Sequence, residues 1–462
     1  MKRPTGQRGN LMNIVLIGVG TMGEAVLSSL EGEGHTVTLI DESNEVVETL
    51  VERFDVSGVV GNGACMEIQK EARVKNAHLV VALTQSDEMN ILCCLVAKYL
   101  GAQNTVARVR NPDYRQQIIA MKDELGISMV INPERETASE IFHLIGLPSV
   151  AGIEHFAEGK VSLVEVVAER GCSLIGETLH SLGKRLVNKV LICAVERKGE
   201  VIIPSGTFAI EENDHIYFTS DARVLADFLA EVNLVKSPLK NIMIVGGDRT
   251  AYYLAERLGG KKYRVKLIVE SAAEAQKLAE LLPRATVIEG NYTSHALLLE
   301  EGIESTDAFV ALSEGDEENL LLSMFASKKN VKKAITRIKS DDLYEMLGAL
   351  GVQNNVSPKN IVSGRILSYI RALANKRGSN VQTLYRLVNN RVEALEFFVK
   401  KKERFYSKPL RELRMKSNSL IACIIRGDLV MIPDGSSTIE MGDTVIVVTT
   451  HKNFDDLNDL FE

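Results

Sequence analysis

The sequence lacks tryptophan altogether, and aromatic residues make up only 5% of its 462 positions. Proteins that bind single-stranded nucleic acid stack the bases on aromatic side chains, so a chain with few of them offers little surface of that kind. The formal net charge of −7 also opposes a polyanionic partner. The composition therefore argues against nucleic acid as the main partner.

Long apolar stretches are missing as well. No apolar run reaches the roughly 18–20 residues that a membrane-spanning helix requires. The first ten residues carry Lys2, Arg3 and Arg8 without the apolar region of a secretory signal, and we set residues 1–11 apart as an N-terminal tail. A hydrophobic share of 45% and a charged share of 25% are typical of globular proteins. The length predicts roughly three or four domains.

Metal-binding and disulfide patterns are also absent. The six cysteines form no CxxC pair and the eight histidines show no HExxH or paired spacing, so no metal site is expected. Most cysteines stand in apolar surroundings, which favours buried, reduced thiols and a cytosolic protein. The lysine-rich runs 328–333 and 400–402 are expected to be solvated faces rather than contacts to a partner or an acidic membrane surface.

One stretch near the N-terminus predicts a phosphate-binding turn. Residues 14–17 form an apolar, largely β-branched run that predicts a buried parallel strand, and the glycine-rich segment 18–23 follows it. In such a GxGxxG pattern the first glycine permits the turn, the second lets the backbone approach a pyrophosphate, and the third lets the next helix pack closely. The N-terminus of that helix offers free N–H groups and a positive dipole end to phosphate.

The second expected strand, residues 37–40, ends at Asp41, which is 18 residues after Gly23. A carboxylate at this place accepts hydrogen bonds from the ribose hydroxyls and repels a 2′-phosphate, so an unphosphorylated ribose is favoured. The alternative is a glycine turn that merely packs the fold.

Further apolar runs alternate with helical spacing and predict an α/β Rossmann-like domain to about residue 150. Ligands bind outside the carboxyl ends of the strands in such sheets, which makes candidates of the turn 61–64 and of Thr84. Arg108 either reaches a phosphate or forms a surface salt bridge, and Arg110 is expected to form a salt bridge. Asp87 is expected to cap the following helix. The expected strands are 56–60, 79–83, 105–110 and 129–133, and the expected helices are 46–53, 90–99 and 136–145.

An internal repeat decides the domain organisation. Residues 79–90 return as 308–319 and Arg108 returns as Arg337, each 229 positions later. Short strands at 161–168, 190–196, 201–203 and 215–219 predict a small α+β module after the first Rossmann-like domain. The chain is therefore predicted to use one Rossmann-plus-module unit twice, with a join near 235–240. The predicted domains are two Rossmann-like doubly wound parallel-sheet domains at 12–150 and 237–378, and two small α+β modules at 151–236 and 379–462.

The glycine turn of the second copy is altered. Asn241 begins a matching strand, but Asp248 stands where the first copy has its second glycine and Ala251 where it has its third. An aspartate at a phosphate-binding turn opposes an anion, and Arg249 is the only newcomer that favours one. The second nucleotide site is therefore expected to be altered or lost.

The ribose-binding acid of the second copy has two candidate positions. At the offset of 228 residues that relates the first strands, Val269 faces Asp41. The offset of 229 later in the chain requires a one-residue insertion somewhere, and an early insertion would bring Glu270 there instead.

Together these features resemble the cytosolic regulatory subunits of Trk-type potassium uptake systems, which are built from tandem KTN/RCK domains. The resemblance rests on the GxGxxG turn, the acid after the second strand, a TxxDExN segment at 84–90, an ARV strand at 107–109 and the order of the repeats. It covers residues 12–462.

The resemblance implies a regulatory subunit, not an enzyme, that gates potassium transport through an integral membrane potassium-translocating subunit. It implies a cytoplasmic protein, peripheral on the inner face of the cell membrane, that assembles into a ring-like homo-oligomer with a tetramer expected. The implied ligand is NAD(H), with ATP and ADP as alternatives. The ligand residues carried over are Gly18, Val19, Gly20, Thr21, Met22, Gly23, Asp41, Asn62, Gly63, Thr84, Gln85 and Arg108.

Two other classes of protein contain Rossmann-like domains. An NAD-dependent oxidoreductase with a duplicated Rossmann unit needs a proton donor beside the nicotinamide. However, no tyrosine starts a YxxxK pattern, no histidine–carboxylate pairing is evident, and no substrate domain follows either Rossmann unit. A DNA-binding redox sensor would need a basic helix-turn-helix, which the sequence lacks.

Overall fold

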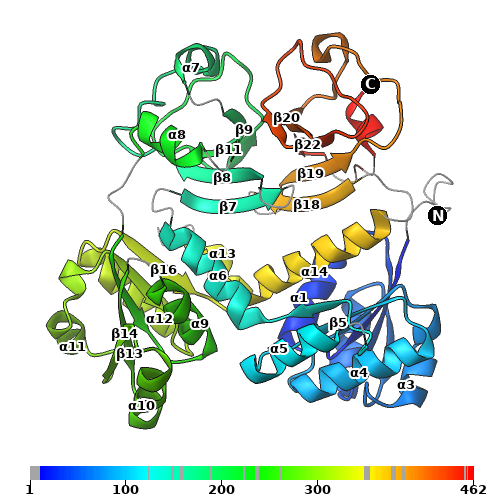
Figure 1. Ribbon diagram of the computed structural model, residues 1–462, viewed down its shortest axis with the longest axis vertical. Coiled ribbons are helices and arrows are strands. Elements are labelled where there is room, and N and C mark those ends of the chain that lie inside the picture. Colours follow the sequence, from blue (N-terminus) through cyan, green and yellow to red (C-terminus); the bar gives the residue numbers. More distant parts are fainter. Residues whose placement is uncertain are drawn as a thin grey trace. The chain divides into compact units, whose positions relative to one another are not determined.

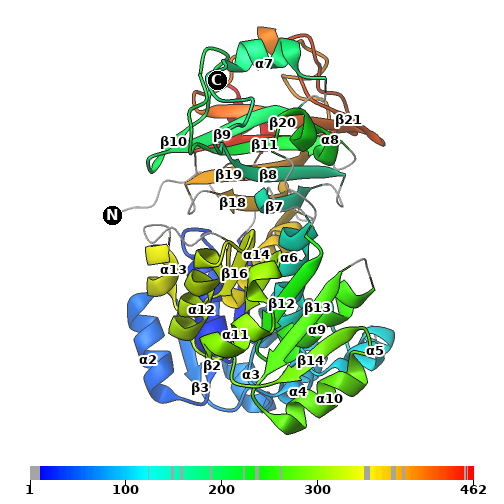
Figure 2. The same ribbon diagram turned by 90° about the vertical axis from the view of Figure 1, so that its left-hand side faces the viewer.

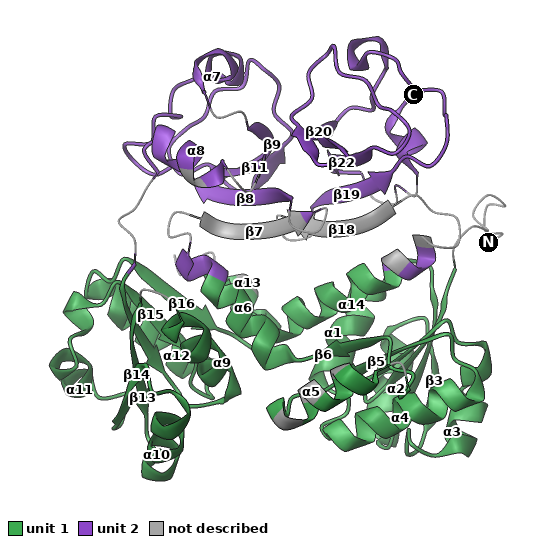
Figure 3. Cartoon of the chain, viewed as in Figure 1, with its two compact units in different colours: residues 1–142, 240–370 green, residues 143–239, 371–462 purple. Residues whose placement is uncertain are grey.

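The computed structural model describes residues 11–122, 124–146, 150–156, 160–187, 190–221, 224–234, 239–260, 263–347, 354–375, 381–387, 391–451, 454 and 456–462. The chain folds into two compact units, which Figure 3 shows in different colours. Unit 1 combines residues 1–142 with 240–370, and unit 2 combines 143–239 with 371–462. Each unit therefore takes a segment from each half of the repeat.

The first half of unit 1 is a parallel sheet in the order β3-β2-β1-β4-β5-β6, the order of a Rossmann fold. Its central strands are buried on both faces, which is why they appear in the sequence as continuous apolar runs. The strands are β1 (Asn13–Ile17), β2 (Thr36–Asp41), β3 (Ser57–Val60), β4 (Leu79–Ala82), β5 (Asn104–Arg108) and β6 (Met129–Ile131).

The helices of this domain follow the strands in turn, as predicted. Asp87 differs from expectation, because it lies inside the first turn of its helix. The cap is Ser86, whose Oγ accepts a hydrogen bond from the Met89 N–H at 3.1 Å. The prediction that Asp87 caps this helix is therefore wrong. The helices are α1 (Thr21–Leu30), α2 (Asn44–Arg53), α3 (Met66–Glu71), α4 (Asp87–Leu100), α5 (Pro112–Met121) and α6 (Pro133–Gly146).

The second half of unit 1 repeats this sheet in the order β14-β13-β12-β15-β16-β17. Its strands are β12 (Asn241–Val245), β13 (Arg264–Val269), β14 (Ala285–Glu289), β15 (Ala308–Ala311), β16 (Lys333–Arg337) and β17 (Asn355–Val356). Its helices are α9 (Arg249–Gly259), α10 (Ala272–Leu281), α11 (His295–Glu300), α12 (Asp316–Lys328), α13 (Asp341–Leu347) and α14 (Pro358–Asn375).

Helices α6 and α14 lie between the two parallel sheets of unit 1 (Figure 1). Arg257 of α9 donates from Nη1 to the Ser139 Oγ of α6 at 2.7 Å, and its guanidinium lies over the Phe142 ring. Arg365 of α14 forms an ion pair of 3.0 Å with Glu136 of α6. The two Rossmann-like domains are thus joined through α6 of the first domain and through α9 and α14 of the second.

Unit 2 holds two antiparallel sheets, in the orders β10-β9-β11-β8-β7 and β21-β20-β22-β19-β18. Figure 2 shows both sheets from the side. The first module contains β7 (Val150–Phe156), β8 (Val161–Val167), β9 (Leu191–Arg197), β10 (Glu200–Ile202), β11 (His215–Asp221), α7 (Leu179–Arg185) and α8 (Leu225–Glu231). The second contains β18 (Val381–Leu387), β19 (Val392–Phe398), β20 (Ser419–Arg426), β21 (Leu429–Met431) and β22 (Thr444–Thr449).

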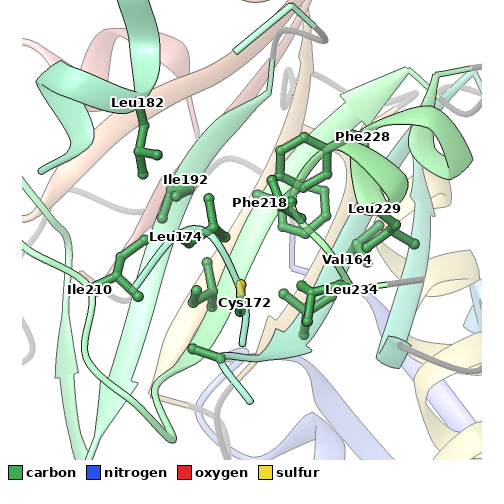
Figure 4. Packing of buried hydrophobic residues seen from close by; sticks show 14 of the residues in the cluster. Val164, Cys172, Leu174, Leu182, Ile192, Ile210, Phe218, Phe228, Leu229 and Leu234 are labelled. Atoms are coloured by element: carbon green, nitrogen blue, oxygen red, sulfur yellow. The ribbon is translucent and has the colours of Figure 1, made fainter. Parts of the chain in front are cut away.

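Each module has a core of its own, and the two share a third. In the first module Phe218 packs on Phe228 with ring centroids 4.8 Å apart (Figure 4). A separate buried cluster combines Phe156 and Leu163 of the first module with Ala394 and Ile446 of the second. The small modules are therefore packed directly against each other through an apolar core.

The predicted fold class is confirmed: two Rossmann-like parallel sheets, each followed by a small module with an antiparallel sheet. The domain boundaries themselves stay predictions. Those at 236 and 378, most of the join at 235–240 and the tail 1–10 lie outside the described residues. Five of the six cysteines are buried, as expected, and burial raises the pKa of the Cys93 thiol to about 12.

No helix in the described part of the chain is both long enough and apolar enough to cross a membrane. Within the same residues, no three His, Cys, Asp or Glu side chains are grouped so that they could hold a metal ion.

Candidate functional site

The turn after β1 needs its first and third glycines for packing. Gly18 has φ +81°, and a Cβ there would lie 2.7 Å from the Thr84 backbone nitrogen. A Cβ on Gly23 would lie 2.6 Å from the Gly18 carbonyl oxygen. Both contacts are too close for any side chain, so these two glycines let α1 approach the carboxyl ends of β1 and β4.

The second glycine has a different environment. Gly20 is the N-cap of α1, and no side chain of the described residues caps this helix. A Cβ on Gly20 would meet nothing within 4 Å. Thr21 and Met22, which follow it, are exposed and half-buried. The N–H groups at the start of α1 therefore face open space, which is the arrangement of an anion-binding helix N-terminus.

Asp41 lies beside this turn at the end of β2. Its Oδ2 accepts a hydrogen bond from the Val19 N–H at 2.8 Å, and its Oδ1 accepts one from the Ser43 N–H at 3.0 Å. Each carboxylate oxygen has a further lone pair, so the group can still accept a hydrogen bond from a ribose hydroxyl.

The turn after β3 closes on the end of β1. Asn62 Oδ1 accepts a hydrogen bond from the Ala64 N–H at 2.8 Å, which shapes the turn. A Cβ on Gly63 would lie 2.2 Å from Ile17 Cγ2, so this position also requires glycine. The structure thus brings Asn62 and Gly63 next to the strand that carries the phosphate-type turn.

Asn90 joins the ends of β4 and β5. Its Oδ1 accepts hydrogen bonds from both the N–H and the hydroxyl of Thr84, each at 2.8 Å, and its Nδ2 donates to the carbonyls of Thr84 and Arg108 at 3.1 and 2.9 Å. Sequence reasoning missed this positioning role, although the recurrence of Asn90 as Asn319 was a signal. Asn319 bridges Ser313 and Arg337 in the same way.

Arg108 lies at the end of β5 with few hydrogen-bond partners. Among the described residues its side chain makes one hydrogen bond, from Nη1 to the Thr84 carbonyl at 3.4 Å, and its buried Nε has no partner. Burial and the neighbouring Arg110 lower the pKa of the Arg108 guanidinium. A group that burial and a like charge disfavour in this way gains from an added anion.

Arg110 and Asp87 hold the segment that follows β5. Asp87 Oδ2 accepts hydrogen bonds from the Arg110 and Asn111 N–H groups at 2.9 and 2.7 Å, and the Arg110 Nε lies 3.8 Å from Asp87 Oδ1. The salt bridge expected for Arg110 is present, but its partner is buried rather than at the surface. Arg110 Nη2 also donates to the Gln85 carbonyl, so Gln85 contributes through its backbone.

In the second copy the corresponding groups are partnered by side chains of the chain itself. Asp248 is the N-cap of α9, and its Oδ1 accepts hydrogen bonds from the Thr250 and Ala251 N–H groups at 2.9 and 3.1 Å. Its Oδ2 forms an ion pair with Arg337 Nη1. Arg337 is only 4% exposed, and its Nη2 donates to the Leu312 carbonyl at 2.8 Å. The helix N-terminus that is open in the first copy is closed here.

The register of the strands decides which residue replaces Asp41. Val245 pairs with Ile268 as Ile17 pairs with Ile40, so the next residue, Val269, takes the place of Asp41. Val269 is buried and apolar. The alternative that Glu270 takes this place is therefore wrong, because the insertion lies after α10 rather than before it.

Fold and site together define a class: a protein of two Rossmann-like domains with phosphate-type turns, each followed by a small antiparallel module. The TrkA-N domain model matches residues 14–133 and 242–358, and the TrkA-C domain model matches residues 163–233 and 394–462. The chain belongs to the TrkA family of potassium uptake proteins, which confirms the resemblance inferred from the sequence.

Similar proteins cover nearly the whole chain. The "Trk system potassium uptake protein TrkA homolog 1" of Methanosarcina mazei is 31% identical over 444 residues, 94% of this chain and 97% of that protein. The "Trk system potassium uptake protein TrkA" of Vibrio alginolyticus is 29% identical over 456 residues, 98% of this chain and 99% of that protein. Because these relatives are named as potassium uptake proteins, they confirm the prediction that the chain is not an enzyme.

Solved structures share the fold. The "GsuK channel bound to NAD" has a TM-score of 0.63 at 17% identity and covers 97% of this chain and 78% of its own. The "Crystal Structure of the GsuK RCK domain" has a TM-score of 0.61 at 18% identity, with 97% of this chain and 94% of its own covered. At this identity the likeness concerns the fold alone.

Proposed function

We propose that this chain is the nucleotide-binding cytosolic regulatory subunit of a Trk-type potassium uptake system. The observation that carries the proposal is the first phosphate-type turn, which packs on Thr84 and leads into the uncapped N-terminus of α1, while the under-partnered Arg108 contacts the carbonyl of the same Thr84. Membership of the TrkA family supplies the context of potassium transport.

The proposed ligand is a nucleotide with a diphosphate, held by the twelve residues carried over from the sequence. The backbone of residues 18–23 and Arg108 would hold the phosphates, and Asp41 would bind the ribose hydroxyls. Asn62 with Gly63 would cover the adenine, and Thr84 with Gln85 would contact the nucleotide at the end of β4. NAD(H) is the first choice, with ATP and ADP as alternatives. The GsuK channel, which shares the fold and is bound to NAD, supports this choice.

The proposed regulation is a population shift. A phosphate on Arg108 would act on the end of β5, where Arg110 is held by Asp87. The Arg110 carbonyl also lies 3.5 Å from the Tyr253 hydroxyl of α9, which belongs to the second Rossmann-like domain. A nucleotide that favours one arrangement of the two domains would bias the state of the whole assembly.

The assembly that we propose is a ring-like homo-oligomer, with a tetramer expected. It lies on the inner face of the cell membrane beneath an integral membrane potassium-translocating subunit. The nucleotide-dependent change in the ring would gate transport through that partner.

Calorimetric titration of the purified chain with NADH, NAD, ATP and ADP tests the ligand proposal. We expect one site per chain and the loss of that site in Gly20→Asp, because a carboxylate at the open N-terminus of α1 repels phosphate. Gly183→Asp is the matched control, since Gly183 also has nothing within 4 Å of an added Cβ. Absence of binding by the wild-type chain would remove the nucleotide proposal and leave the fold unchanged.

Potassium flux through vesicles that contain a Trk-type membrane subunit tests the gating proposal. Addition of the wild-type chain should make the flux depend on nucleotide, and addition of Gly20→Asp should not. Equal nucleotide dependence with both proteins would contradict the role of the first cleft.

A further inference from the structure

The two copies of the phosphate-type turn have nearly the same backbone conformation but different residues at the N-cap. Gly20 has φ −64° and ψ −165°, and Asp248 has φ −67° and ψ 178°, so the two N-caps are almost superimposable in conformation. Neither conformation requires glycine. The difference between the copies is therefore chemical: the second turn carries a carboxylate where the first carries only a hydrogen atom.

The Asp248 carboxylate makes the contacts that a phosphate would make. It accepts two hydrogen bonds from N–H groups in the first turn of α9, and it pairs with the arginine at the end of β16. Arg337 corresponds to Arg108, which forms no such ion pair with the described residues of the first copy. Charge-assisted hydrogen bonds of this kind are the strong ones, and here they involve a buried cation.

We infer that Asp248 is a built-in replacement for a bound phosphate, and that it holds the second Rossmann-like domain permanently in the anion-occupied state. Of the two Rossmann-like domains, only the first then responds to the phosphate of a bound nucleotide. This inference deepens the proposed function and rests on it, because it takes the first cleft to be a phosphate site.

The second domain then serves as a fixed reference for the first. Helix α9 begins at the Asp248 cap and carries Tyr253, whose hydroxyl lies 3.5 Å from both the Arg110 carbonyl and the Asn132 Nδ2 of the first domain. A helix held by its own anion does not respond to nucleotide. A nucleotide-dependent movement at the end of β5 would therefore shift the first domain relative to an α9 that does not move.

The first experiment copies the second arrangement into the first cleft. Gly20→Asp should raise the melting temperature of the ligand-free chain, because the new carboxylate caps α1 and pairs with Arg108. Gly20→Asn caps the helix without the charge and should raise it less. Adding Arg108→Gln should remove the difference between the two substitutions. A ligand-free Gly20→Asp chain that is no more stable than Gly20→Asn would overturn the inference.

The second experiment opens the second cleft, with inorganic pyrophosphate as the probe. In the Gly20→Asp background the first site does not bind pyrophosphate, so any binding is expected at the second site. Pyrophosphate should bind Gly20→Asp/Asp248→Gly about 10- to 100-fold more tightly than Gly20→Asp alone. Adding Arg337→Gln should abolish this gain. Equal pyrophosphate binding with and without Asp248→Gly would sink the idea.

Asp248→Asn provides a variant for the case that Asp248→Gly does not fold, because asparagine keeps the helix cap and removes only the charge. NADH should not bind to the opened second cleft, since Ala251 and Val269 remain in place of the third glycine and the ribose acid. Tight NADH binding there would show that a free Arg337 is sufficient for binding, and it would contradict the requirement for the third glycine and the ribose acid.

The inference and the proposed function fail separately. Wild-type chain that binds none of the four nucleotides refutes the proposed function. A double-mutant cycle measures how far the stability effects of Asp248→Asn and Arg337→Gln depend on each other, and it uses no nucleotide. Additive effects on the free energy of unfolding would refute the built-in anion even if the first site binds NADH.

Discussion

At the turn after β3, Gly63 has no room for a side chain. A Cβ there would lie 2.2 Å from Ile17 Cγ2 and 3.4 Å from the Cys93 Sγ. Gly63→Ala should therefore lower the free energy of unfolding by about 1–3 kcal/mol through overpacking. Chemical denaturation measures the change. Gly183→Ala is the control, and it should be neutral or stabilising because α7 accepts alanine without a clash.

Asp41 holds the backbone of the glycine turn and is proposed to hold the ribose. Asp41→Ala should weaken NAD binding by about tenfold or more, because two backbone donors and the ribose hydroxyls lose a charged acceptor. The free energy of unfolding should fall by less than the free energy of NAD binding. Calorimetric titration and thermal unfolding give the two values. The exposed neighbour Glu42 provides the control Glu42→Ala, and equal losses of affinity in both variants would argue against the role of Asp41.

At the scale of elements, α6 carries a carboxyl group whose protonation depends on folding. Burial raises the pKa of Glu140 from 4.5 to about 7, and Arg365 opposes this shift only in part. The folded state therefore keeps a proton that the unfolded chain releases at lower pH. The stability linked to this proton is fully present below the pKa of the unfolded chain and is lost as the pH rises through about 7.

Glu140→Gln should remove this dependence. The free energy of unfolding of the wild-type chain should fall by about 2–3 kcal/mol relative to Glu140→Gln between pH 5 and pH 8. Urea titrations at a series of pH values measure the difference. Parallel pH profiles for the two proteins would show that Glu140 does not titrate in this range.

At the scale of the whole molecule, the two small modules share a core in unit 2. Phe156→Ala should leave a cavity in that shared core and cost about 3–5 kcal/mol. Hydrogen exchange should then rise in both modules, because each loses packing. Phe218→Ala, in the core of the first module alone, should raise exchange mainly in residues 160–234. A rise confined to the first module after Phe156→Ala would contradict a shared core.

Local pattern was enough to predict the sheets and the turns at the carboxyl ends of their strands. The apolar runs that form β1, β4 and β15 are buried on both faces, and such runs are recognisable without any tertiary information. The steric need for Gly18 and Gly23 also follows from their spacing. The role of Asp87 does not follow from local pattern, because its carboxylate accepts hydrogen bonds from backbone groups that come 23 and 24 residues later, whereas helix capping is a local rule.

The sequence by itself determined the repeated architecture, the family and the loss of a glycine turn in the second copy, because these depend on residue identity and spacing along the chain. Only the tertiary structure decided that Val269 replaces Asp41, since strand register is a pairing between distant segments. It alone also decided that Asp248 meets Arg337, 89 residues away. Whether the carboxylate at this turn repels a ligand or replaces it depends on the partner that the fold brings to it.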